Sequence, residues 1–116
     1  LVGSEMCIRD SAYTDKSKSE RTDMQKKVDS ILRKHKVDMY ICGHLHNYQH
    51  IRLQDSKIDY VVNTSGSQTR TPDKIDGTVF CSDASGFSVL TANKKTLNLN
   101  MLNKNGEIIH IVKREK

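Results

Sequence analysis

The pattern of apolar and polar positions predicts a helix in the first third of the chain. The spacing i, i+4, i+7 and i+8 collects four apolar residues on one helical face, Met24, Val28, Ile31 and Leu32. Thr22 and Gln25 fit a capping box, in which each side chain satisfies a free backbone donor. The basic residues over 33–36 suit the negative end of the helix dipole.

Two short apolar segments after this helix predict strands. Residues 37–42 (VDMYIC) are apolar and end at Gly43, and residues 58–64 (IDYVVNT) form a similar run that ends at Ser65 and Gly66. A helix that leads into a short buried strand indicates half of a parallel-sheet unit. Residues 66–85 carry little pattern, so we expect a long irregular loop there.

The last third of the chain changes to a two-residue alternation. Apolar and polar residues alternate over 87–91, 97–101 and 108–113, and the connections 93–95 and 103–106 hold residues typical of turns. This pattern predicts an antiparallel meander of three strands with one buried face.

Composition narrows the function classes only slightly. The chain has 116 residues, 35% of them hydrophobic, and a formal net charge of +5. The lysines are scattered, which favours a solvated surface over a nucleic-acid interface. The three cysteines, Cys7, Cys42 and Cys81, form no CxxC motif, and no apolar run approaches the roughly 18 residues of a membrane span.

Residues 1–11 (LVGSEMCIRDS) are interpreted separately from the rest. They resemble translated sequencing-adapter sequence, so we treat them as an artefactual leader and exclude them from fold reasoning. The alternative is a genuine strand or linker. We therefore expect residues 12–116 to be part of a domain that continues upstream.

The strongest chemical signal is Gly43-His44-Leu45-His46-Asn47, directly after the segment 37–42. Residues i and i+2 of an extended segment point to the same side, about 6–7 Å apart. Metal–imidazole bonds are about 2 Å long, and paired catalytic metals lie about 3.5–4 Å apart. One histidine could therefore serve each metal of a pair, although two histidines in an exposed turn would give the same pattern.

The order of these features resembles the final segment of the calcineurin-like metallophosphoesterases, and most of all the purple acid phosphatases. The resemblance covers nearly all of residues 20–116 and is most specific in the GHxHN box. It implies the α/β fold class, as the C-terminal half of a four-layer α/β/β/α sandwich that ends in an antiparallel meander. The parent would be a hydrolase of phosphomonoesters.

The resemblance also implies a cofactor of two metal ions, iron with zinc, manganese or iron. His44 would bind the divalent metal and His46 the ferric iron, with Asn47 supporting the ligands. The family's other ligand boxes are absent from this sequence. We therefore expect the chain to need the N-terminal half of the same domain as its partner and to be inactive alone.

The remaining candidate residues allow two interpretations each, and no catalytic acid can be assigned. Tyr48 could line the substrate opening, but packing at the strand entry is favoured. His50 could reach the rim of the site, but a surface histidine is favoured. Arg70 could pair with substrate phosphate, although a solvated arginine is the ordinary interpretation. Relatives of this branch are often exported, while no residue here indicates a compartment.

Two other classes of function fit parts of the sequence. One is a structural zinc site built from Cys42, His44, His46 and Cys81, which would close only if Cys81 folds back to the other three. The other is a basic module that binds nucleic acid, which lacks the interleaved aromatic residues and dense basic stripe of such modules. We expect neither nucleic-acid binding nor a membrane span.

Overall fold

The computed structural model describes residues 25–43 and 45–115. The predicted helix is present there as a π-helical turn η1 (Gln25–Asp29) followed by α3 (Ser30–Lys34). Lys36 has a φ of 52°, and the Val37 amide donates to the Leu32 carbonyl. This arrangement is a Schellman ending with lysine in the position that glycine usually takes. Thr22 and Met24, on which the predicted helix start rests, lie outside the described residues, as does the leader.

Four strands form the first sheet: β1 (Met39–Cys42), β2 (Tyr48–Ile51), β3 (Asp59–Val62) and β4 (Thr78–Ser82). The strand order is β1-β3-β2-β4; β1 and β3 are parallel, and β2 is antiparallel to both of its neighbours. The predicted strands over 37–42 and 58–64 are thus confirmed with shorter bounds. β4 lies inside the segment expected to be an irregular loop.

The predicted meander is confirmed as the second sheet. Its strands β5 (Gly86–Ala92), β6 (Thr96–Asn103) and β7 (Ile108–Glu115) pair antiparallel in chain order. The side chain of Asn93 accepts hydrogen bonds from two following backbone amides, and that of Asn103 does the same. These local bonds fix both turns.

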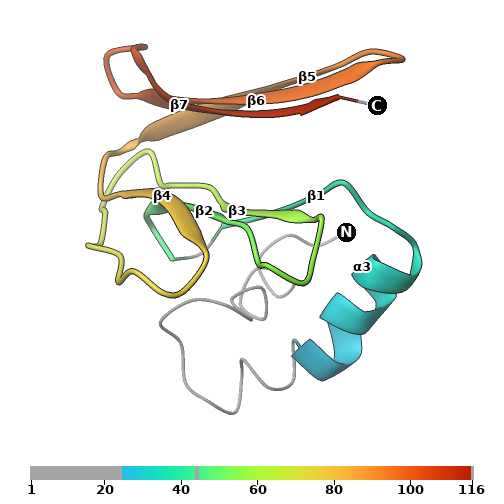
Figure 1. Cartoon of the computed structure of the whole chain (residues 1–116). Coiled ribbons are helices and arrows are strands. Elements are labelled where there is room, and N and C mark those ends of the chain that lie inside the picture. Colours follow the sequence, from blue (N-terminus) through green and yellow to red (C-terminus); the bar gives the residue numbers. More distant parts are fainter. Residues whose placement is uncertain (1–24, 44, 116) are drawn as a thin grey trace.

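The core lies between the two sheets. Figure 1 shows the three-stranded sheet over one face of the four-stranded sheet, with α3 on the other side. Side chains from both sheets form one buried cluster: Tyr48, Val61, Leu99, Met101 and Val112. On the opposite face of the first sheet, Leu32 of α3 packs against a second cluster of Ile51, Ile58 and Tyr60. Burial of apolar area in these two layers drives the fold.

Two apolar side chains of β5 lie on the outer face of the second sheet, so the alternation over 87–91 does not mark the buried face. Phe87 and Val89 point outward, and Phe87 is 50% exposed, whereas Ser88 pairs in register with the buried Met101. At the start of β5, a Cβ on Gly86 would lie 1.9 Å from the carbonyl oxygen of Leu102. Only glycine therefore allows β5 to approach β6 this closely.

The predicted α/β fold class is wrong. The described residues hold seven strands in two sheets and a single short α-helix, so this part of the chain is a mostly β two-sheet structure. No helical layer covers the outer face of β5–β7 within the described ranges, and apolar residues stay exposed there. The physical reason is that the helical repeat lasts for little more than two turns, whereas most of the apolar pattern has a period of two.

Leu99 and Leu90 offer a matched test of this packing, because they are direct partners on β6 and β5. Leu99 is 1% exposed and Leu90 is 50% exposed. We expect Leu99→Ala to lower the free energy of unfolding by about 2–5 kcal/mol, because it leaves a cavity between the sheets. Leu90→Ala should cost clearly less. Equal effects in urea titrations would contradict the packing of the two sheets described above.

Candidate functional site

The histidine box lies where β1 ends. The Leu45 amide donates to the Gly43 carbonyl, and the Asn63 amide donates to the Cys42 carbonyl, so the ends of the parallel strands β1 and β3 are tied together. Binding sites in sheet proteins are often built at this carboxyl end of parallel strands. His44 itself lies outside the described residues, so its predicted role stays a prediction.

His46 has an unusual backbone conformation. Its φ is 58°, a left-handed value that few residues other than glycine adopt. Its side chain is half-buried, and its carbonyl oxygen accepts a hydrogen bond of 2.9 Å from the Arg70 amide. Strained backbone of this kind gathers at functional sites, where surrounding bonds maintain it. This hydrogen bond brings the exposed Arg70 next to the box, although the two are far apart in the sequence.

Asn47, the last residue of the box, is buried. Its side-chain oxygen accepts a 2.8 Å hydrogen bond from the amide of Gln49, which is also buried. Among the described residues, Gln49 Oε1 has no hydrogen-bond partner. The supporting role predicted for Asn47 is compatible with this position and stays a prediction.

Tyr48 and His50 point away from the box, into the space between the sheets. The Tyr48 hydroxyl lies 2.7 Å from the Phe87 carbonyl oxygen and 2.8 Å from that of Leu102, which makes it a packing residue that bridges to the second sheet. His50 is 3% exposed. The surface position predicted for His50 is therefore wrong, because β2 alternates and its even-numbered residues face inward. A place at the rim of the site stays a prediction.

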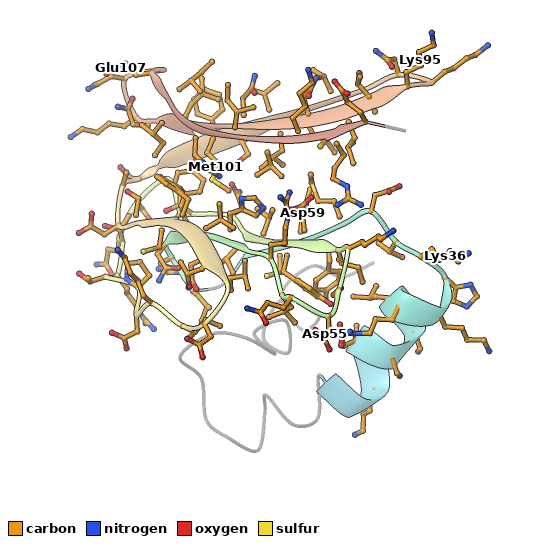
Figure 2. The ribbon with its side chains drawn as sticks, viewed as in Figure 1. Lys36, Asp55, Asp59, Lys95, Met101 and Glu107 are labelled. Atoms are coloured by element: carbon orange, nitrogen blue, oxygen red, sulfur yellow. The ribbon has the colours of Figure 1, made fainter. Side chains whose placement is uncertain are left out.

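A charged cluster that sequence reasoning missed surrounds His50. Its centre is Asp59 of β3, which is fully buried and appears between the sheets in Figure 2. Asp59 Oδ1 lies 2.8 Å from His50 Nε2, and 2.9 and 2.7 Å from Nε and Nη2 of Arg52. Asp59 Oδ2 accepts a 3.2 Å bond from Arg114 Nη1, which reaches across from β7.

These contacts decide the charge of Asp59. Burial raises the pKa of this carboxyl, but hydrogen bonds from His50 and Arg52 and the charge of Arg52 outweigh it, so the pKa lies below its ordinary value. Asp59 is therefore ionised at neutral pH. The sequence carried two signals for this cluster. His50 and Arg52 are two residues apart, which puts both side chains on the inner face. His110 and Arg114 are four residues apart, which is also an even spacing.

The geometry argues against a zinc site from Cys42, His44, His46 and Cys81. Cys42 pairs in register with Val62, Val62 with Gln49, and Gln49 with Cys81, so the two cysteines lie on opposite edges of the sheet. Three strand spacings separate them, about 14 Å. Zinc–sulfur bonds of about 2.3 Å cannot close that distance.

Within the described ranges, no group of three or more histidine, cysteine, aspartate or glutamate side chains could hold a metal ion. The ligand roles predicted for His46 and for His44, which lies outside the described residues, stay predictions. In the same ranges, no helix has the length and apolar character to cross a membrane.

The comparisons with known proteins concern the fold. No protein-family model matches the chain, and no curated protein matches it. The fold is similar to a solved structure described as "GAP50 the anchor in the inner membrane complex of Plasmodium", with a TM-score of 0.73 and 23% sequence identity. The match covers 81% of this chain and 30% of that chain. The described part of the chain thus has a GAP50-like two-sheet fold.

Removing the central charge tests the cluster. We expect Asp59→Asn to lower the free energy of unfolding by about 1.5–3 kcal/mol, because it removes the charge that accepts hydrogen bonds from His50, Arg52 and Arg114. Asp55→Asn is the control, because Asp55 pairs with Arg33 in an exposed position, where ion pairs contribute about 0–1 kcal/mol. Similar losses for the two variants in urea titrations at pH 7.5 would contradict this assignment.

Proposed function

We propose that this chain is the C-terminal part of a metal-dependent phosphoesterase and that the GHxHN box supplies two of the ligands of its dinuclear metal centre. The observation that carries the proposal is the box at the end of β1, with His46 in a left-handed conformation that its surroundings hold. The proposed metals are iron with zinc, manganese or iron, and the proposed substrate is a phosphomonoester. The remaining ligands would come from a longer parent chain.

The residues of this chain would have the following roles. His44 and His46 would each hold one metal through an imidazole nitrogen, and the buried Asn47–Gln49 amide pair would support the segment that carries them. Arg70, tied to His46 through its backbone, would bring a guanidinium group to the site for the phosphate. When bound, a metal pair polarises phosphoryl oxygens and activates a water for attack on phosphorus.

The test uses the complete reading frame of the source DNA, read across Ser11. We expect the purified protein to carry two metal ions and to hydrolyse p-nitrophenyl phosphate. His46→Ala should lower kcat/KM by at least about 100-fold, because even loss of a residue that only supports a ligand costs about 10–100-fold. His35→Ala is the control, since His35 is exposed at the helix end. A folded protein without metal or activity would overturn the proposal.

A non-catalytic anchoring role is the second candidate. The outer face of the three-stranded sheet exposes Phe87, Val89, Ile108 and Ile111, each by 41–53%. A contiguous apolar surface of this kind is typical of interaction sites, and the similar structure is described as an anchor. Anchoring through this face would need no metal.

The second candidate predicts a loss of attachment when the outer face is made polar. The double variant Phe87→Ser with Ile111→Ser should reduce the fraction of protein that sediments with membranes of the expressing cell. His46→Ala should leave that fraction unchanged. If the apolar face is irrelevant to attachment, the double variant will sediment like the wild type.

A further inference from the structure

Two histidines from opposite sheets face each other in the core. His50 Nδ1 on β2 lies 2.9 Å from His110 Nε2 on β7, and the other ring nitrogen of His50 lies 2.8 Å from Asp59 Oδ1. The ring of Phe80 stacks on His110, with centroids 4.3 Å apart and planes within 4°. The histidine pair therefore joins the sheets through a hydrogen bond in an enclosed position.

This geometry allows a single hydrogen between the two rings. An ionised carboxylate only accepts hydrogen bonds, so His50 Nε2 must carry a hydrogen that it donates to Asp59. In neutral His50, Nδ1 is then an acceptor, and His110 Nε2 donates to it. If both rings were protonated, two N–H groups would face each other at 2.9 Å with like charges.

The charged groups around the histidine pair disfavour a second proton on it. Arg52, directly after β2, faces Asp59. Arg114 of β7 also faces Asp59 and lies 3.5 Å from Asp38, which precedes β1. Both oxygens of Asp59 already accept hydrogen bonds. The packing side chains from β4 and β6 are uncharged, chiefly Phe80 and Met101. A doubly protonated histidine pair would therefore add positive charge beside two arginines.

We propose that the His50–His110 pair is an acid-sensitive latch between the two sheets: one shared hydrogen holds it closed, and protonation of both rings opens it. The latch does not depend on the proposed metal centre, because neither histidine is one of its proposed ligands. Opening would separate β7 from β2 and expose the core cluster between them. Acid would thus weaken the contact between the sheets well before it neutralises Asp59.

The direction of the pH effect follows from linkage. Burial and the charge of His50 lower the pKa of His110 below its ordinary value of about 6.5. The folded state therefore binds fewer protons than the unfolded state once the pH falls below that value. The stabilisation is complete above about 6.5 and declines as the pH drops. Each proton taken up on opening raises the unfolding constant by about tenfold per pH unit.

The test compares unfolding constants from urea titrations of the full chain at pH 7.5 and 5.5. For the wild type we expect the constant to rise by up to about tenfold. His110→Gln keeps an N–H donor for His50 and removes one titrating ring, so most of that rise should vanish. His35→Gln removes an exposed histidine and should behave like the wild type. An undiminished rise in His110→Gln would overturn the proposal.

A second measurement on the wild type holds even if the variant fails to fold. In ¹⁵N-histidine NMR spectra at pH 7.5, His50 should carry a hydrogen on Nε2 that it donates to Asp59, and His110 should carry one on Nε2 that it donates to His50. Lowering the pH should protonate the two rings in coupled steps, with the second step accompanied by loss of the folded signals. Independent protonation of both rings without loss of folded signals would rule out the latch.

Discussion

The arrangement of the two sheets depends on the contacts of the buried Asp59 carboxylate. An ionised group without water is costly unless it is paired and hydrogen-bonded. Here His50 of β2, Arg52 directly after β2 and Arg114 of β7 all reach it. The apolar core supplies most of the driving force, but apolar contacts have little direction. The charged cluster has direction, and we infer that it sets how the sheets lie over each other.

The candidate site depends on the same frame. β2 runs from the box directly into the space between the sheets, where Tyr48 and His50 both contact the second sheet. The end of β1 pairs with β3, which carries Asp59. The left-handed turn at His46 is thus fixed between two anchored strands. A box placed in this way can hold ligands in one position, which catalysis and metal binding both require.

The sequence predicted the parts of the fold with a clear period. The meander and the strands that became β1 and β3 were found because alternation or a closed apolar run marks them. β2 was missed because both of its faces are buried, so that Gln49 and His50 hide the alternation. The fold class was wrong because a resemblance supplied helical layers that the described residues do not contain.

Local chemistry was less visible than local structure. The box could be located from its residues, but the direction of Tyr48 and His50 depends on the face that β2 presents to a sheet 39 or more residues away in sequence. The partners of Asp59 come from β2, the residue after it and β7, and no local spacing links Arg114 to the other two. A buried ion cluster of this type becomes visible only when strand order and register are known.

A double-mutant cycle on Asp59 and Arg114 tests the central claim most directly, because it measures coupling across the sheets rather than the cost of either change. Asp59→Asn, Arg114→Gln and the double variant would be compared by urea unfolding at pH 7.5. We predict a coupling of at least about 1 kcal/mol, as for residues within one ion-pair network. A coupling of zero, within the error of about 0.3–0.5 kcal/mol, would contradict the claim that this contact positions the two sheets.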